Sequence, residues 1–267
     1  MKTEILKFYN LVGTFYKSNI VSKDLIIVAI GIPNLKDVDN LRNVDILNMY
    51  GYDVFVPDYY GFCRSGGKFS PKSCINTLID SKKYFSGSNG INVSSGEEKF
   101  YKYGRISFLG LSFGGSLVSV LPRFDKSINE IGLFYPALEF SNLGKIGKPE
   151  ESVDDFYNVI DRGYTNLYNG IKSKSFKDYF RDLTLFTPIK NIKYLNNTSV
   201  FIAHGTEDES INYSRSKDFY NKLKTLNNSG DFIYKEYKGT GHSGVTMKYA
   251  SHEFMHFLDE RKQINKN

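Results

Sequence analysis

Residues 105–114 of this chain read RISFLGLSFG, and this stretch decides the fold that the sequence predicts. RISFL predicts a strand, and the residues after the stretch have helical spacing. Between them, Gly110 and Gly114 flank Ser112 in a Gly-x-Ser-x-Gly pentapeptide, whose small residues let the strand and the helix pack closely. Such a turn lifts the serine hydroxyl above the sheet and aims the first helical amide, that of Phe113, at a developing oxyanion. Ser112 is therefore the candidate nucleophile, the alternative being an ordinary turn serine.

Short apolar runs alternate with helical patterns on both sides of this stretch, which predicts an α/β protein with a mostly parallel central sheet and helices on both faces. Asn10 marks the turn between two antiparallel strands near the N-terminus, and the polar segment 86–103, rich in Gly, Ser and Asn, is interpreted as a surface excursion. Strands are expected at 4–17 (two), 25–30, 53–57, 105–109, 131–135, 200–203 and 232–237, and helices at 38–50, 71–85, 116–121, 213–226 and 245–260.

The segment 137–190 interrupts this alternation with helix-like patterns and no convincing strand. We interpret it as a small helical cap inserted over the site, with 1–136 and 191–267 forming the core. Its aromatic side chains either line an acyl pocket or form the core of the cap itself, and helical spacing favours the second reading. They are Phe156, Tyr157, Tyr164, Tyr168, Tyr179 and Phe180.

A serine hydroxyl attacks a carbonyl only when a neighbouring base takes its proton, and that base needs an acid to orient it. His242 lies in the glycine-rich loop GTGHSG after the last expected strand. Asp208 ends the sequence HGTED, directly after the strand at 200–203. Both residues lie in loops that directly follow expected strands. They also follow Ser112 in the order serine, acid, histidine, which a nucleophile on a strand-turn-helix motif requires. Glu207 and Glu209 are alternatives to Asp208 that read as solvated neighbours.

These motifs resemble those of the α/β-hydrolase superfamily over most of the chain, in particular its esterase- and peptidase-like members with a short cap. DYYGFCRSGG at 58–67 is similar to the superfamily's Asp-x-x-Gly-x-Gly-x-Ser signature, and Gly31-Ile-Pro33 resembles its His-Gly-x-Pro loop. The resemblance implies that the amide of Ile32 is the second oxyanion donor, although Ile30 stands where the family has histidine. The resemblance also makes Glu139 an alternative to Asp208, because Glu139 follows the strand expected at 131–135 and some members of the superfamily place the acid there.

Two further side chains within these motifs have their own interpretations. Arg64 in the 58–67 loop is expected to anchor that loop, the alternative being a carboxylate-binding role. His204, at the end of the strand before Asp208, is expected to pack or hydrogen-bond there rather than to perform catalysis.

The sequence His252-Glu-Phe-Met-His256 matches the His-Glu-x-x-His pattern of zinc proteases, in which two imidazoles share one helix face. A catalytic zinc needs a third protein ligand, which such enzymes supply downstream. Only Asp259 and Glu260 are available there, and the longer pattern would need glycine and histidine at Asp259 and Lys262. We interpret the match as coincidental and expect no metal.

Composition excludes several classes of function. The net charge of +6 comes from scattered lysines interleaved with acids, which does not indicate nucleic-acid binding. Cys63 and Cys74 form neither a disulfide framework nor a metal spacing. There is no apolar run long enough to span a membrane and no secretory signal, so the expected location is cytoplasmic.

Together these features predict a serine hydrolase that cleaves a carboxylic ester through an acyl-enzyme. Ser112, Asp208 and His242 form the expected triad, and the amides of Phe113 and Ile32 form the expected oxyanion hole. The expected partner is a small acyl substrate, with no cofactor. The alternatives are a serine peptidase of the aminopeptidase or acylpeptide type, a thioesterase, and a non-enzymatic binding protein.

Overall fold

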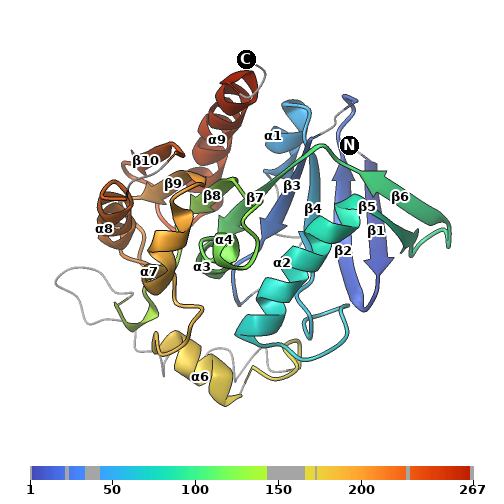
Figure 1. Cartoon of the computed structure of the whole chain (residues 1–267), viewed down its shortest axis with the longest axis horizontal. Helices are drawn as coiled ribbons and strands as arrows, with labels where there is room; N and C mark the ends of the chain where they lie inside the picture. The colour runs from blue at the N-terminus through green and yellow to red at the C-terminus, as the bar shows by residue number, and fades with distance from the viewer. Residues whose placement is uncertain are drawn as a thin grey trace.

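A ten-stranded sheet organises the chain in the computed structural model, which describes residues 2–21, 24–33, 43–142, 166–171, 173–226 and 229–264 (Figure 1). The strand order is β10-β9-β8-β7-β3-β4-β2-β1-β5-β6. The strands are β1 Lys2–Phe8, β2 Leu11–Lys17, β3 Asp24–Ala29, β4 Asp53–Pro57, β5 Ser86–Asn92, β6 Glu98–Lys102, β7 Arg105–Leu111, β8 Glu130–Phe134, β9 Ser199–Gly205 and β10 Phe232–Tyr237.

The strands from β10 to β4 in this order are parallel, and the remaining four pair antiparallel. All residues of β3, β4, β8 and β9 are buried, as expected of parallel strands covered on both faces. The predicted mostly parallel α/β architecture is confirmed. Since parallel strands end at the same edge, the loops after β3, β7, β8, β9 and β10 lie together, and the site residues lie in these loops.

The helices lie on both faces of the sheet because the chain moves across the sheet in one direction from β3 to β4 and in the opposite direction from β4 onwards. The connection from β3 to β4 carries α1 (Val44–Met49), whereas those from β4 to β7, β7 to β8 and β9 to β10 run the other way and carry α2 (Pro71–Phe85), α3 (Phe113–Val118) and α8 (Tyr213–Leu223). Right-handed crossovers in opposite directions place α1 opposite the other three. The last helix, α9 (Gly244–Ile264), packs against α1, and α2 packs against α3.

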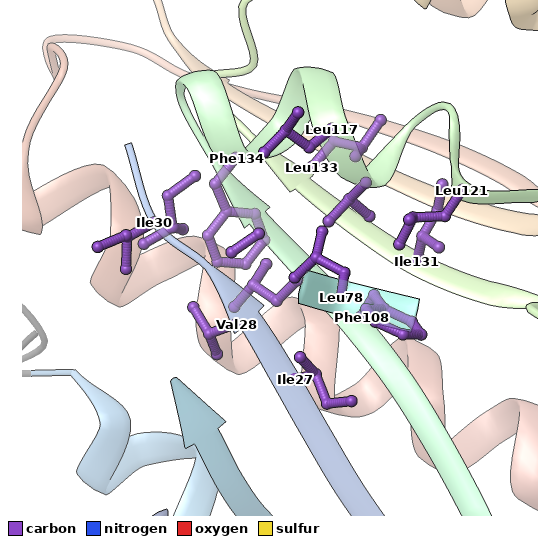
Figure 2. Close-up of a cluster of buried hydrophobic side chains, with 14 of the residues drawn as sticks. Ile27, Val28, Ile30, Leu78, Phe108, Leu117, Leu121, Ile131, Leu133 and Phe134 are labelled. Carbon is purple, nitrogen blue, oxygen red and sulfur yellow. The ribbon is translucent and has the colours of Figure 1, made fainter. Parts of the chain in front are cut away.

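The core consists of alternating side chains from the central strands. Ile27, Phe108 and Ile131 lie side by side in register on β3, β7 and β8, and they form a cluster with Leu78 of α2 (Figure 2). On the opposite face, Phe134 packs edge-on against Phe254 of α9, with ring centroids 5.9 Å apart. The period of two thus gives each face of β7 and β8 its own helix layer.

The segment 86–103 corrects one sequence-based prediction. It is not a surface excursion, because β5 and β6 form a hairpin that extends the sheet, and Leu6 of β1 pairs with Asn92 of β5. Gly, Ser and Asn have low β propensity, so the pairing with an already formed strand overrides the local preference.

Only parts of the predicted cap fall within the described residues. These parts contain a short 3-10 turn, η2 (Phe140–Asn142), and two short helices, α6 (Lys174–Phe180) and α7 (Pro188–Asn191). The predicted aromatics Phe156, Tyr157 and Tyr164 lie outside the described residues, as does the start of the helix expected at 38–50. The division into core and cap stays a prediction.

Candidate active site

Ser112 occupies a strained turn between β7 and α3. Its backbone angles are φ 55° and ψ −118°, in a region that non-glycine residues rarely adopt. The turn is held on both sides, since the Ser112 amide donates to Phe134 O at 3.0 Å and its carbonyl accepts from the amides of Gly115 and Ala137. The end of β8 therefore fixes the serine, and strain persisting under this restraint is typical of a functional position.

Gly114 shows why the pentapeptide needs its second glycine. A Cβ at this position would lie 1.9 Å from the backbone oxygen of Ala29 in β3, which has no freedom to move away. The close contact lets the helix pack directly onto the neighbouring strand. The sequence pattern at 110–114 is therefore a packing requirement as well as a chemical one.

We expect Gly114→Ala to lower the free energy of unfolding by about 3 kcal/mol or more, because the added methyl group overlaps backbone rather than a side chain. The matched control is Gly104→Ala, where a Cβ would meet nothing within 4 Å and the expected change stays within about 0.5 kcal/mol. Urea unfolding of the two variants measures the difference. Equal stabilities would contradict the close packing described for α3.

Asp208 lies on the turn after β9 with only 1% of its surface exposed. Its Oδ1 accepts from the amides of Ser210 and Ile211 at 2.9 and 2.8 Å. Its Oδ2 lies 2.7 Å from His242 Nδ1 and 3.0 Å from His204 Nε2. Burial alone would raise the pKa of this carboxyl, but the hydrogen bonds from His204 and His242 outweigh it and hold the pKa below its usual value. Asp208 is thus a buried carboxylate aimed at His242.

His242 lies in the loop between β10 and α9, and this loop is tied both to the acid loop and to the first turn of α9. The Glu207 amide donates to Thr240 O at 2.9 Å, and Thr246 Oγ1 donates to Gly241 O at 2.6 Å. Tyr135, which follows β8 at φ 39°, lies over the imidazole with the ring centroids 4.5 Å apart. The ring is thereby oriented by Asp208 on one side and Tyr135 on another. No sequence signal marked Tyr135 for this role.

Ser112 and His242 both contact the end of β8, Ser112 through Phe134 O and His242 through the Tyr135 ring. Both residues are described, and no hydrogen bond joins the Ser112 hydroxyl to His242. The 2.7 Å bond to Asp208 occupies Nδ1, which leaves Nε2 as the nitrogen available to a nucleophile. Catalytic hydrogen bonds are often long without substrate and shorten in the reacting complex.

The solvent reaches His242 through an open depression of about 630 Å³. The acid and base loops line it with Glu207, Glu209, Ser210, Gly241 and His242. Glu207 and Glu209, the alternatives to Asp208, are exposed. Glu139, the other alternative acid, is half-buried. The carboxylate that is hydrogen-bonded to His242 Nδ1 is that of Asp208 and not that of Glu139.

The loop after β3 places Gly31 and Ile32 against the serine. A Cβ at Gly31 would lie 3.1 Å from Ser112 Cβ, so the backbone of this loop passes directly beside the nucleophile. Tyr59 donates its hydroxyl to Ile30 O at 2.7 Å, and this bond restrains the loop at the position where the family has histidine. The loop before Ile32 therefore contacts the serine, and the assignment of the Ile32 and Phe113 amides as oxyanion donors stays a prediction.

Aromatic side chains from the described part of the cap segment pack on buried aromatic side chains of the core, Phe113 and Phe62. Tyr179 and Phe180 are fully buried, and their ring centroids lie 5.9 and 6.5 Å from that of Phe113. Tyr179 also shares a hydrogen bond of 2.6 Å with Ser116 of α3. Tyr168 stacks on Phe62 at 4.6 Å. Tyr179 and Phe180 therefore anchor α6 to the start of α3, and Tyr168 anchors the preceding segment to Phe62.

Arg64 anchors its loop as expected. Its Nε lies 2.6 Å from Asp58 Oδ2, and a second nitrogen lies 3.0 Å from Asp58 Oδ1, so the pair is bidentate.

His252 and His256 lie beside the Tyr50 hydroxyl, at 3.2 and 3.4 Å from it. Within the described ranges, no three His, Cys, Asp or Glu side chains come together in a way that could hold a metal ion.

Comparisons with known proteins agree with this fold. The prolyl oligopeptidase family matches residues 145–263. A search of curated proteins finds no match. The chain is similar in structure to the esterase Est1E from Butyrivibrio proteoclasticus, with 15% identity, a TM-score of 0.68, and coverage of 98% of this chain and 100% of that one. It is also similar to the Pyrococcus furiosus esterase Pf2001, with 16% identity, a TM-score of 0.65, and coverage of 97% and 90%.

Part of a larger protein has the same fold. A prolyl endopeptidase structure matches with 14% identity and a TM-score of 0.63, covering 96% of this chain but 37% of that one. Among the helices that the structure describes, none is long and apolar enough to cross a membrane. The likenesses to solved structures extend over nearly the whole chain, and the family match covers its C-terminal part.

Proposed function

Because the chain has the α/β-hydrolase fold and its C-terminal part matches the prolyl oligopeptidase family, which together support a serine hydrolase, we propose that it hydrolyses a carboxylic ester through an acyl-enzyme. The observation that carries the proposal is the strained Ser112 between β7 and α3, beside loops that hold His242 against a buried Asp208 at 2.7 Å.

The proposed reaction has two steps. Ser112 Oγ attacks the ester carbonyl carbon while His242 Nε2 takes its proton, and the carbonyl oxygen becomes an oxyanion facing the amides of Phe113 and Ile32. His242 returns the proton to the alcohol oxygen, whose bond to the acyl carbon breaks. Water then attacks the acyl-enzyme with His242 again as base, releasing the carboxylic acid and restoring Ser112.

Each group has a separate energetic task in this scheme. Asp208 stabilises the imidazolium that forms on His242, because its carboxylate stays ionised in a buried position. The two amides stabilise charge that exists only in the transition state, a contribution that is about 3 kcal/mol for a single donor in comparable sites. The restrained turn holds half-buried Ser112 in place at the end of β7, so little reorganisation of the serine is needed when a substrate binds.

A peptidase is the second candidate, favoured by the match to the prolyl oligopeptidase family over 145–263. The same triad cleaves esters, thioesters and amides, so the triad alone does not discriminate. Among the structural neighbours, Est1E has been determined with ferulic acid bound, an aromatic carboxylic acid. Aromatic acyl groups therefore belong in any substrate panel for this chain.

The test compares an ester, a thioester and a p-nitroanilide that carry the same acyl group, with alkyl, feruloyl and aminoacyl series. Each kcat/KM is divided by the uncatalysed rate, because activated esters are intrinsically more reactive than anilides. We expect the largest acceleration for an oxygen ester. A larger acceleration for an aminoacyl anilide than for its matched ester would establish the peptidase instead, and one for the thioester would establish a thioesterase.

A further inference from the structure

His204 is a second histidine on the candidate acid, and the reaction described above does not use it. It lies near the end of β9 with its side chain fully buried. Its Nε2 is 3.0 Å from Asp208 Oδ2 and 3.1 Å from Ile211 O, and its Nδ1 is 2.7 Å from Ser216 Oγ of α8. Every polar atom of this imidazole therefore has a partner, in a place that solvent does not reach.

These partners determine which nitrogen of His204 carries the proton. Both neighbours of Nε2, the Asp208 carboxylate and the Ile211 carbonyl, are acceptors only, so Nε2 must be protonated. The neighbour of Nδ1 is a hydroxyl, and Ser216 satisfies a bare Nδ1 by donating to it. The neutral Nε2–H form is thus fully hydrogen-bonded. A doubly protonated His204 would instead place a second cation on the carboxylate that must stabilise His242 when His242 takes the serine proton.

The Asp208 carboxylate is then held by four donors, two on each oxygen. The amides of Ser210 and Ile211 bind Oδ1, while His204 and His242 bind Oδ2. Rotation of the carboxyl group would break all four bonds at once. The other ring nitrogen of His204 is hydrogen-bonded to Ser216 of α8, so His204 ties the acid loop to α8.

We propose that His204, held by Ser216 as the neutral Nε2–H tautomer, is a positioning residue that keeps Asp208 Oδ2 aligned with His242 Nδ1. The proposal rests on the proposed function, since alignment of an acid with a base matters only if the base acts. His204 touches Asp208 and not the reacting atoms, so its loss lowers kcat and leaves KM unchanged. Ser216 acts indirectly, because its hydrogen bond to Nδ1 of His204 keeps the proton of that imidazole on Nε2.

The first test does not depend on activity. Long-range ¹H–¹⁵N NMR of the wild-type protein distinguishes a protonated from a bare ring nitrogen, and His204 is assigned by the loss of its signals in His204→Gln. From the hydrogen-bond partners we expect Nε2–H with a bare Nδ1. A proton on Nδ1, with or without one on Nε2, would overturn the proposal, even if Ser112 were labelled by a fluorophosphonate.

The second test compares two replacements of similar size. His204→Gln can present an N–H near the place of Nε2, whereas His204→Met cannot donate. We expect kcat to fall roughly 10- to 100-fold in the Met variant, as for other groups that orient a catalytic residue by a hydrogen bond. In the Gln variant we expect at least half of this loss, on a logarithmic scale, to be restored. KM should stay within about twofold in both. Equal losses in both variants, or a change confined to KM, would contradict a positioning role.

Ser216→Ala keeps the experiment decisive if the His204 variants fail to fold. Its control is Ser81→Ala, which also removes a buried serine hydroxyl that donates one hydrogen bond, to Thr77 O at 2.7 Å in α2. We expect kcat to fall roughly 3- to 10-fold in Ser216→Ala and to stay at wild type in Ser81→Ala, at matched thermal stability. Equal kcat in the two variants would refute the link through α8. Absence of fluorophosphonate labelling in the folded wild type would instead refute the proposed function.

Discussion

Ser112→Ala is expected to lower kcat for the best ester by roughly 10⁴- to 10⁶-fold and to abolish labelling by a fluorophosphonate probe. The alanine side chain has no hydroxyl to form the acyl-enzyme, so only binding and the oxyanion amides remain. Activity is measured at substrate saturation with enzyme prepared free of wild type. Folded wild-type protein that does not react with the probe would refute a serine nucleophile at this position.

The stability of the Ser112 variants provides an independent control. Alanine keeps the Cβ that is strained at φ 55°, so Ser112→Ala should unfold at nearly the wild-type denaturant concentration. Glycine adopts this region without strain, and Ser112→Gly should be more stable than Ser112→Ala by about 1 kcal/mol after the entropy of the unfolded glycine is subtracted. Such a pair separates loss of chemistry from loss of fold. A glycine variant less stable than the alanine variant would contradict strain at the turn.

Much of this site could be predicted from the sequence because its elements are specified locally. Helix α2 begins and ends at the predicted residues, and a proline with a serine cap marks its start. Ser112 was identifiable because its pentapeptide falls between a strand and a helix. The chain order then limited the acid and base to loops that follow later strands, which is where the structure places Asp208 and His242.

Other features depend on contacts that no local pattern records. The hairpin of β5 and β6 has the composition of a loop and becomes sheet only by pairing with β1. Tyr135 reaches His242 because β8 ends beside β9, and its role follows from topology rather than residue type. Ser216 lies on the buried side of α8 and gives no sequence signal as a partner of His204. These residues become visible only when separate elements are brought together.

Asp208→Asn is expected to lower kcat by about 10⁴-fold, because an amide in this position favours the wrong tautomer of the base. If the Asn oxygen keeps the bonds from Ser210 and Ile211, its NH₂ group faces His242. That imidazole must then accept at Nδ1 and carry its proton on Nε2, where it cannot take the proton of Ser112. Glu139→Gln should leave kcat within about threefold. The opposite pattern would assign the acid to Glu139.

Asp208→Asn should also change the free energy of unfolding in a pH-dependent way, and the lowered pKa of Asp208 fixes the sign of this pH dependence. A carboxyl whose pKa is lower in the folded than in the unfolded chain stabilises the fold above the unfolded value of about 3.9 and loses this contribution as the pH falls through the folded value. At pH 7 we expect Asp208→Asn to be about 2 kcal/mol less stable than wild type, because the variant loses hydrogen bonds to a buried charged carboxylate and leaves a buried donor without an acceptor. The difference should narrow steadily below about pH 4.

The control for stability is Asp218→Asn on α8, whose carboxylate is exposed and 3.9 Å from Arg215. An exposed pair of this kind contributes at most about 1 kcal/mol, so this variant should track wild type at every pH and keep full activity. Urea unfolding from pH 3 to 8 measures both variants under the same conditions. A stability difference for Asp208→Asn that does not depend on pH would mean that the carboxylate is not held as a buried anion. The histidine orientation proposed for catalysis would then lose its physical basis, because an anion at Asp208 is what fixes the proton on His242 Nδ1 and leaves Nε2 free for Ser112.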